Sequence, residues 1–537
     1  MSSNHFFRAV RNAAPARATG TFLRTPSGFS WTYSEMLAHS GRYARALQEL
    51  GLQPGDRLVA QVEKSPQALI LYLATIRCGG IFLPLNPAYT DSEVAYFLTD
   101  AGPKVFLCDP ARREGLSTIA ANAGIEAVET LGQDGEGSFS ARLRATADFE
   151  DASRGPDDCA AILYTSGTTG PSKGAMLTHD NLVSNAQTLV SYWRFSRRDV
   201  LLHALPIFHT HGLFVAVNTV LFSASQMIFL PKFDPAECLG LMPQATVLMG
   251  VPTFYTRLLR QDKLSPETTS HMRLFISGSA PLLAETHRAF FERTGHKILE
   301  RYGMTETGMN TSNPCEGERR AGSAGLVLPG VLLRIANPQT GKPLARGETG
   351  IIEVKGPNVF MGYWRNPEKT AQAFRADGFF ITGDLGKIDD DGYLHIAGRA
   401  KDLIISGGLN VYPKEVEAEI NALPGVIESA VIGVPHGDFG EAVIAVAVTK
   451  PGVRLDERSV QAALAERLAK FKVPKRVIFA RELPRNAMAK VQKTILREEF
   501  KELFRQGEPN GSRLRRAAAA PEQAEPSGPE AHFPLRR

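Results

Sequence analysis

The chain alternates short apolar runs with helical patterns over most of its length, and this alternation constrains the fold more than any other feature. Apolar runs of strand length recur at VLMGV (247–251), RLFIS (273–277), GIIEVKG (350–356) and YLHIAGR (393–399). Ser65 and Pro66 supply a cap and a first-turn proline for a helix over QALILYLATIRCGG (67–80). Apolar strands that alternate with helices predict parallel sheets layered with helices, so we expect an α/β fold.

The length of 537 residues is too great for one simple core, so two or more domains are expected. From Pro413 the pattern becomes a compact β/α unit of about 100 residues, the size of a small domain. It contains helical patterns at 414–423 and 459–471 and apolar strands at 426–434, 442–448 and 475–480. Residues 506–537, rich in alanine, proline and glutamate, predict a disordered tail.

Charge and cysteine content exclude several classes of protein. The net charge is +5 without a dense basic block, so nucleic acid is not an expected partner. The five cysteines are scattered with no CxxC pair, which argues against a zinc site or a disulfide framework and favours a reducing compartment, the cytoplasm. No apolar run approaches the roughly 20 residues of a membrane span.

The first 34 residues contain arginines and no acidic residue, which is compatible with a transit peptide or with a short amphipathic helix over NHFFRAVRNA (4–13). We favour the helix, as the opening of the folded domain.

The stretch YTSGTTGPSKG (164–174) is built to hold phosphate. It fails the P-loop pattern, because Lys173 is preceded by Ser172 and followed by Gly174. It is not a plain linker, because a strand-like run, CAAILYT (159–165), precedes it and a helical pattern, 176–193, follows it. A strand, a Gly/Ser/Thr loop and a helix predict a phosphate cradle in which N–H groups and hydroxyls donate and Lys173 neutralises charge.

Five stretches in this order resemble the acyl-adenylate-forming superfamily, which includes acyl-CoA synthetases, luciferases and adenylation domains. Besides the phosphate loop they are ERYGMTE (300–306), FFITGD (379–384), GRAKDLIISGGLNVYPKEVE (398–417) and PRNAMAKVQK (484–493). The likeness runs from about residue 4 to 505. It implies a large N-terminal AMP-binding domain (1–398) of layered β-sheets and helices, a hinge (399–402) and a small mobile C-terminal α/β domain (403–505).

The resemblance implies that a carboxylate attacks the α-phosphorus of ATP, and that preorganised cations stabilise the charge that develops. Lys490 would bridge the carboxylate and the α-phosphate as a compact cation, and Glu306 would hold Mg²⁺ with Thr169. Lys173, Thr305 and His209 complete the expected catalytic set. The expected ATP contacts are Thr165, Ser166, Gly167, Thr168, Thr169, Gly170, Lys173, Ser279, Ala280, Pro281, Glu300, Arg301, Tyr302, Gly303, Met304, Thr305, Asp384, Arg399 and Lys490.

In the second step, coenzyme A would attack the acyl-adenylate after the small domain has rotated about Lys401. Ser406, Gly407 and Gly408 would line the pantetheine tunnel, where absent side chains leave room. One position departs from the family: Ala489 stands where glycine usually precedes the catalytic lysine. If that backbone needs a positive φ, the alanine costs on the order of 1 kcal/mol, and adenylation is the step at risk.

The residues expected around the acyl group point to a short dicarboxylate. A buried arginine without an anion is costly, so Arg257 or Arg301 in the pocket would imply a second substrate carboxylate, held bidentately. The alternative is that either arginine pairs with Glu300, Asp262 or another protein acid. The stretches LPLNPAYT, HALPIFHTHGLF, VPTFYTRL, FISGSAPL and ERYGMTETGMNTSNP resemble those of malonyl-CoA synthetases. The expected malonate contacts are His209, Thr210, Arg257, Ser277, Arg301 and Met309.

Three other functions stay open: ligation of a different short or methyl-branched acid to coenzyme A, loading of a carrier protein, and catalytically weak nucleotide binding. The partners expected are the small molecules malonate, ATP and coenzyme A, with no membrane and no nucleic acid. A lysine acyltransferase that modifies Lys490 is a further hypothesis, because acylation would remove the charge of an exposed lysine.

Overall fold

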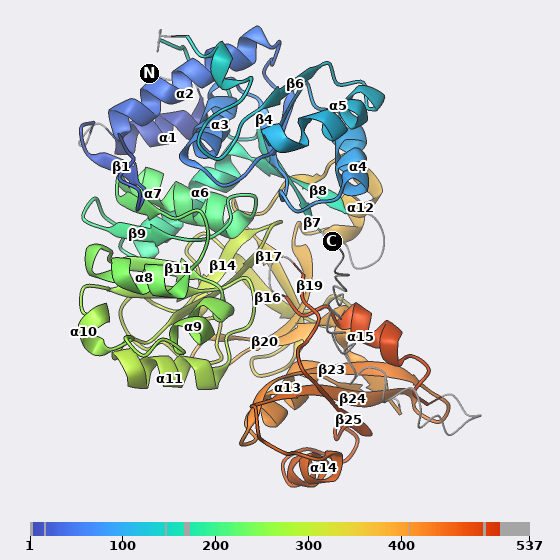
Figure 1. Cartoon of the computed structure of the whole chain (residues 1–537). Coiled ribbons are helices and arrows are strands. Elements are labelled where there is room, and N and C mark those ends of the chain that lie inside the picture. The colour runs from blue at the N-terminus through green and yellow to red at the C-terminus, as the bar shows by residue number, and fades with distance from the viewer. Residues whose placement is uncertain are drawn as a thin grey trace, which may run out of the picture. The chain divides into compact units, whose positions relative to one another are not determined.

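The computed structural model describes residues 4–14, 18–144, 148–165, 172–407, 409–486 and 490–504. The chain forms two compact units, Met1–Lys401 and Asp402–Arg537, shown in blue to yellow-orange and in orange to red in Figure 1. Each unit is described separately below.

A seven-stranded sheet forms the first part of the large unit. Its order is β18 (Gly362–Tyr363), β8 (Lys173–Thr178), β7 (Cys159–Thr165), β4 (Ile81–Pro84), β3 (Arg57–Gln61), β5 (Val105–Cys108) and β6 (Ala127–Thr130). The strands from β7 to β6 pair in parallel, and β8 and β18 extend the sheet in antiparallel pairing. The central strands are buried on both faces, as expected for parallel strands covered by helices.

A nine-stranded sheet forms the second part. Its order is β15 (Leu326–Val327), β14 (Gly308–Ser312), β13 (Leu299–Met304), β12 (Leu274–Ser277), β11 (Val247–Gly250), β9 (Val200–His203), β10 (Gln226–Phe229), β1 (Thr21–Arg24) and β2 (Ser30–Thr32). The strands from β13 to β1 are parallel. Their carboxyl ends therefore lie at one edge, where ligands bind in open α/β sheets.

One continuous apolar core joins the two sheets through helices. Phe6 of α1 (His5–Ala13) packs against Tyr72 of α3 (Pro66–Arg77), and Tyr72 packs against Phe82 of β4. Helices that contact this layer are α2 (Tyr33–Glu49), α6 (His179–Tyr192) and α7 (Asn218–Ser223). The helix predicted at the N-terminus is confirmed: Asn4 caps α1, whose aromatic face is buried.

Further helices cover the other faces. The seven-stranded sheet packs against α4 (Asp91–Ala101) and α5 (Arg113–Asn122). The nine-stranded sheet packs against α9 (Pro252–Leu258) and α11 (Ala284–Thr294), through Tyr255, Phe275 and Phe290. The short helices α8 (Pro235–Leu241) and α10 (Pro266–Thr269) lie beside them. The predicted α/β fold of layered sheets and helices is confirmed.

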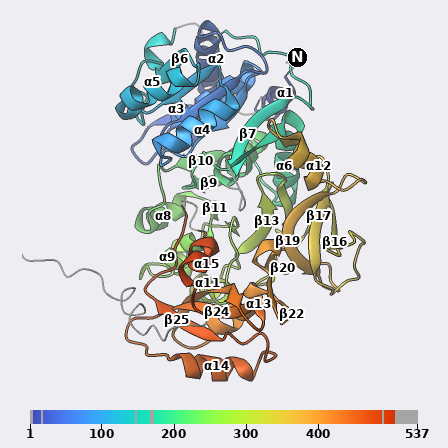
Figure 2. The ribbon, with the colours of Figure 1, turned by 90° about the vertical axis from the view of Figure 1, so that its right-hand side faces the viewer.

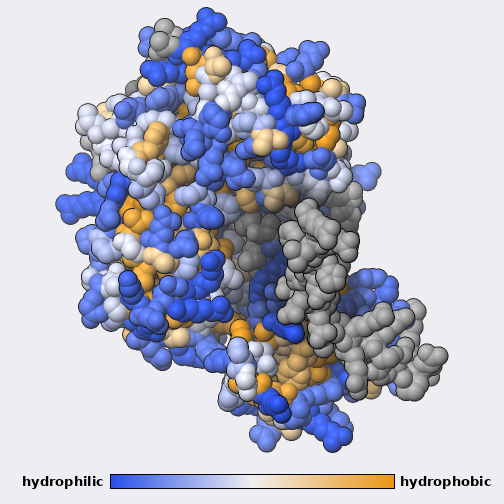
Figure 3. Space-filling model, viewed as in Figure 1, coloured by the Kyte–Doolittle hydropathy of each residue, from blue (hydrophilic) through white to orange (hydrophobic). Residues whose placement is uncertain are grey.

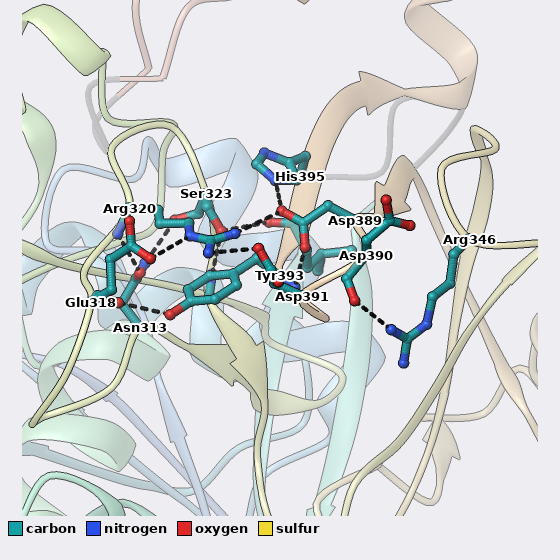
Figure 4. Close-up of polar contacts among 12 residues, drawn as sticks. Asn313, Glu318, Arg320, Ser323, Arg346, Asp389, Asp390, Asp391, Tyr393 and His395 are labelled. Atoms are coloured by element: carbon teal, nitrogen blue, oxygen red, sulfur yellow. Dashed lines mark hydrogen bonds and ion pairs between the residues drawn. The ribbon is translucent and has the colours of Figure 1, made fainter.

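An antiparallel sheet completes the large unit. Its order is β16 (Leu332–Ala336), β17 (Gly350–Lys355), β19 (Phe380–Ile388) and β20 (Leu394–Arg399), and Figure 2 shows it below α12 (Pro367–Ala373). Arg320 anchors the turn between β19 and β20, as Figure 4 shows. It pairs with Asp389 at 3.3 Å and Asp391 at 2.7 Å and lies over the ring of Tyr393, while His395 Nε2 lies 2.8 Å from Asp389. These contacts fix the two strands that carry Asp384 and Arg399.

The small unit is a sheet with helices on both faces. The strands are β22 (Leu409–Val411), β21 (Ile404–Ser406), β24 (Gly440–Thr449) and β23 (Val426–His436) in this order, with β25 (Arg476–Ala480) parallel to β24. One face packs against α13 (Pro413–Asn421) and α14 (Glu457–Ala465), and the other against α15 (Lys493–Phe500). Arg497 of α15 pairs with Asp402 at 2.6 Å, which ties the start of the unit to its last helix.

In the described part of the chain, no helix is both long and apolar enough to cross a membrane. The face of the large unit in Figure 3 is mostly hydrophilic, with scattered apolar patches. All five cysteines are free thiols, and Cys78, Cys108 and Cys238 are buried.

One local prediction was wrong. The glycine-rich stretch leads into the antiparallel strand β8, and α6 begins only at His179, so the two strands around the loop form a hairpin. The cradle therefore lacks the helix N-terminus that we expected directly after it. The segment after VLMGV is helix α9, and Arg257 lies within that helix.

Candidate active site

The two strands around the phosphate loop are held by neighbouring side chains. Thr165 ends β7 and pairs with Lys173, the first residue of β8. Tyr96 of α4 donates to the carbonyl of Ser172 at 2.7 Å. The loop residues Ser166, Gly167, Thr168, Thr169 and Gly170 lie outside the described residues. The base of the loop is thus fixed by both the sheet and α4.

Tyr363 links the lysine of this loop to the predicted metal-binding glutamate. The Lys173 ammonium lies 5.2 Å from the centre of the Tyr363 ring, and the Tyr363 hydroxyl donates to Glu306 at 3.1 Å. Glu306 is buried, and burial raises the pKa of its carboxyl, an effect that the bond from Tyr363 opposes. Thr305 stands directly before it and lines a small cavity with Thr210.

The Asp384 carboxylate is satisfied at both of its oxygens. Arg399 Nε lies 2.7 Å from one oxygen, across the pairing of β19 with β20, and the Tyr302 hydroxyl donates to the other at 2.6 Å. Burial and Asp384 raise the pKa of the Tyr302 hydroxyl, so it stays protonated and donates. The structure brings together three residues that we assigned to the nucleotide.

The loop after β12 carries three of the residues expected to contact ATP. Ser279 and Ala280 are half-buried and Pro281 is exposed. Ser279 has a φ of 69°, a left-handed conformation that is uncommon for serine. Glu300 accepts a hydrogen bond from the backbone N–H of Leu282 at 3.2 Å and so supports the end of this loop. Gly303 and Met304 continue β13 and are partly buried.

Arg301 is a buried cation with unfilled hydrogen-bonding capacity. Its residue surface is 4% exposed, and neither Nε nor Nη2 has a hydrogen-bond partner among the described residues. Its guanidinium packs directly on Gly278, where a Cβ would stand 2.4 Å from Cζ. Burial lowers the pKa of Arg301 to about 9, which still leaves it charged at neutral pH. A buried charge of this kind is stable only with a partner.

Three further residues assigned to or near the acyl group carry polar atoms without partners. Ser277 Oγ, Thr210 Oγ1 and His211 Nε2 are buried and make no hydrogen bond to any residue that the structure describes. His209 is half-buried, and its Nδ1 lies 3.4 Å from the backbone N–H of His211. Met309 is buried and packs close to Gly303. Arg301 contacts Gly278 and His211 contacts Ser279, so both lie beside the strand end that carries Ser277.

Arg257 is not buried, although the prediction of a substrate-binding arginine required burial. It is exposed on α9, and its guanidinium lies 5.2 Å from the ring centre of Phe233. Since the prediction required a buried arginine, it applies to Arg301 and not to Arg257. The alternative that a protein acid neutralises Arg301 does not account for its two nitrogens without partners.

The residues assigned to the later steps lie at or beyond the end of the large unit. Lys401, its last residue, is exposed. In the small unit, Ser406 is buried in β21, and Gly407 follows with a φ of 59°, which favours glycine. Lys490 is exposed, and its backbone N–H bonds to the Asn486 side chain at 3.0 Å. Gly408 and Ala489 lie outside the described residues.

Two residues at the site were not predicted from the sequence. His211 is the second histidine of the quoted FHTHG, and its spacing of two from His209 was a signal that we did not use. Tyr363 carried no comparable signal, because tertiary contacts bring it to Glu306: β18 pairs with β8, and the backbone N–H of Phe360 donates to the carbonyl of Glu306 at 2.8 Å.

Comparison with known proteins agrees with this geometry. The AMP-binding enzyme family matches residues 6–364, and the AMP-binding enzyme C-terminal domain matches residues 415–490. A crystal structure of ATP-bound MatB from Rhodopseudomonas palustris has 60% sequence identity and a TM-score of 0.92, and covers 94% of this chain and 100% of that one.

Curated relatives are more distant and act on different acids. A malonate–CoA ligase of Arabidopsis thaliana is 34% identical over 497 residues, 86% of this chain and 81% of the relative. A feruloyl-CoA synthase of Amycolatopsis is 36% identical over 479 residues, 88% of this chain and 94% of the relative. With both domain matches and the motifs in order, this chain belongs to the AMP-binding enzyme family.

Proposed function

We propose that this protein ligates malonate to coenzyme A through a malonyl-adenylate, converting ATP to AMP and pyrophosphate. The observation that carries the choice of acid is Arg301, a buried cation with two nitrogens that lack partners in the described part of the chain. A substrate with a second carboxylate would supply the missing anion in bidentate form. The likeness to a malonate–CoA ligase supports the same choice.

In the adenylation step, one carboxylate of malonate attacks the α-phosphorus and pyrophosphate leaves. Asp384 would accept the ribose hydroxyls, with Tyr302 and Arg399 holding its carboxylate in place. Lys173 would contact the outer phosphates from the start of β8. Thr305, the loop residues Thr165 to Gly170 and the segment Ser279 to Pro281 are assigned to the same nucleotide.

Glu306 suits a Mg²⁺ ion. Mg²⁺ is usually bound by one or two carboxylates together with substrate phosphates, not by a cage of protein ligands. Glu306 is such a single carboxylate, and no group of three or more His, Cys, Asp or Glu side chains that could hold a metal occurs in the described ranges. The ion would neutralise phosphate charge, with Thr169 as the second proposed ligand.

Lys490 would serve adenylation only, and the glycines after Ser406 would serve coenzyme A after rotation about Lys401. Lys490→Ala should therefore lose most adenylate formation and still convert supplied malonyl-AMP and coenzyme A to the thioester. Equal loss in both half-reactions would contradict this role. Replacing Ala489 by Gly should leave adenylation unchanged or faster.

A substrate panel tests the function as a whole. Acetate, propionate, butyrate, malonate, methylmalonate and succinate are each supplied with ATP and coenzyme A, and pyrophosphate and thioester are measured. We expect malonate to give the highest kcat/KM. A higher value for a monocarboxylate or for succinate would overturn the malonate assignment. A protein that loads carriers would make no thioester with free coenzyme A, and a binding protein would turn over no ATP.

Two finer proposals accompany this function. The free cysteines support action in a reducing compartment such as the cytoplasm. Acylation of Lys490 by a lysine acyltransferase would remove the charge that adenylation needs. If mass spectrometry of protein isolated from cells finds no acylated Lys490, the second proposal fails.

A further inference from the structure

We propose that His211, held by Ser279 as the neutral tautomer with its proton on Nε2, is a second anchor for the distal carboxylate of the substrate. The inference rests on the proposed function and deepens it. It assigns the selection of a dicarboxylate to a pair, one charged donor and one neutral donor, instead of to Arg301 alone.

The position of His211 follows from the π-helix that it begins, His211–Val217, after the loop that leaves β9. Segments of π-helix occur frequently at functional sites. The imidazole is 2% exposed and lies beside the strand end that carries Ser277, Gly278 and Ser279. Because the guanidinium of Arg301 packs on Gly278 and the imidazole of His211 bonds to Ser279, both groups border the same three residues.

Burial and the nearby charge of Arg301 keep the imidazole of His211 neutral. Burial, and next the charge of Arg301, hold the pKa of His211 well below its ordinary value, with His209 and His203 contributing in the same direction. A neutral imidazole has one N–H donor and one bare nitrogen acceptor, so the partner of one nitrogen determines the role of the other.

Ser279 determines that role. Its Oγ lies 3.2 Å from His211 Nδ1, and its hydroxyl can donate to this nitrogen. Nε2 then carries the proton. His211 Nε2 and Arg301 Nε and Nη2 all lack partners among the residues described. Both residues border the same strand end, through Gly278 and Ser279. A carboxylate bound beside this strand end would accept from both.

The conformation of Ser279 agrees with a positioning role. Its φ of 69° is one that a serine adopts rarely and that glycine would adopt freely. Glycine at this position would relieve the backbone but would lack the hydroxyl that orients His211.

Kinetics with two acids test the proposal. Butyrate matches malonate near the reacting carboxylate and has no second one. His211→Phe removes the donor and keeps a ring, so malonate kcat/KM should fall roughly 10- to 100-fold, while butyrate kcat/KM and the KM for ATP change little. His211→Gln, which can still donate, should recover part of the loss. Ser279→Ala should lower the malonate-to-butyrate ratio of kcat/KM severalfold, because any loss through its contact with the nucleotide falls on both acids alike.

A spectroscopic measurement tests the tautomer independently of activity. In protein labelled with ¹⁵N-histidine, the signals that disappear in His211→Gln identify His211. We expect them to report a neutral ring protonated at Nε2 at pH 7, and a mixture of tautomers in Ser279→Ala. A wild-type ring protonated at Nδ1 would overturn the proposal.

The control is His39→Phe, which changes a half-buried histidine of α2 that packs on Trp31 and should leave the use of both acids unaffected. Equal loss on malonate and butyrate in His211→Phe would make His211 structural, and no loss would mean that the carboxylate is held elsewhere. If wild-type protein does not use malonate, the proposed function has failed, whereas failure of the His211 variants alone leaves that function in place.

Discussion

The two ends of the candidate site differ in how well their polar groups are satisfied. At the end that we propose for the ribose, called the ribose end below, the Asp384 carboxylate is paired at both oxygens, with Tyr302 and Arg399. At the end that we propose for the acyl group, called the acyl end, Arg301, His211 and Ser277 present polar atoms that are buried without a partner among the described residues. Buried polar groups are normally paired, and a ligand at the second end would supply the partners that these residues lack.

This difference separates what the fold provides from what the substrate provides. The ribose end is complete in the absence of a ligand, and its hydrogen bonds stabilise the protein. The acyl end is a preorganised set of donors whose desolvation is offset only when an anion binds. Substitutions at the first end should therefore lower stability, whereas substitutions at the second should lower the use of malonate and leave the unliganded protein as stable or more so.

Arg301→Met should have the largest effect. It keeps the bulk of the side chain and removes the charged fork. Truncating one partner of a desolvated charged pair costs roughly 2–5 kcal/mol, so malonate kcat/KM should fall about 30-fold or more. Butyrate should lose nothing or gain, because an unpaired cation no longer faces its methyl group. The measured quantity is the malonate-to-butyrate ratio of kcat/KM.

The same variant distinguishes a substrate anchor from a structural arginine. Without malonate, the free energy of unfolding should stay the same or rise, because an unpaired buried charge has been removed. A clear loss of stability, or a uniform loss on both acids, would show that Arg301 supports the fold or the nucleotide.

Asp384→Asn should give the opposite pattern. It breaks a paired carboxylate, so the free energy of unfolding should fall by roughly 1–3 kcal/mol and the KM for ATP should rise about tenfold. The malonate-to-butyrate ratio should not change. Asp377→Asn is the matched control, because Asp377 pairs with Arg334 at 2.6 Å in the same region but is not assigned to the site. A changed malonate-to-butyrate ratio of kcat/KM in Asp384→Asn would contradict the view that the two ends of the site act independently.

Glu306→Gln should have a smaller effect on stability, and its sign follows from the raised pKa. Because burial raises the carboxyl pKa in the folded protein, the folded state retains a proton that the unfolded state has released, and stability falls as pH rises from the ordinary glutamate pKa through the raised one. Glutamine stays neutral, so the variant should be more stable than wild type above this window and should lose that part of the pH dependence. Thermal unfolding between pH 4 and 8, without nucleotide, measures it. A variant that is less stable at pH 8 would contradict the sign.

Much of the fold was predictable, because local patterns agree with the tertiary structure. The apolar runs VLMGV and RLFIS became the adjacent buried strands β11 and β12, and the cap at Ser65 starts α3 as predicted. The start of α6 was also in the sequence: Thr178 and Asn181 form a capping box. Strand β8 was missed because KGAMLT has no alternation of polar and apolar residues, and its pairing partner β7 fixes it instead.

The candidate site was less predictable, because depth decides the role of each arginine. Arg257 lies in the helix that follows β11 and Arg301 lies within β13, and one sequence cannot show which side chain points inward. A helix predicted over the residues of α9 would have indicated that Arg257 is exposed. Phe254, Tyr255 and Leu258 occupy its buried face, which leaves Arg257 on the exposed one. For Arg301, the decisive fact is the packing of its guanidinium on Gly278, a contact between neighbouring strands.

Arg257→Met should have the smallest effect, and it sharpens the comparison because it makes the same chemical change as Arg301→Met. Arg257 is exposed, and its contact with Phe233 is of the cation–π type. Such contacts at exposed sites contribute about 0.5–1 kcal/mol, so stability should fall slightly and malonate kcat/KM should stay within about twofold of wild type. Thermal unfolding and the malonate-to-butyrate ratio of kcat/KM, measured for both Arg257→Met and Arg301→Met, test this expectation. If Arg257→Met were the variant that lost malonate, the distal carboxylate would bind at α9, and the unsatisfied donors around Arg301 would need another ligand.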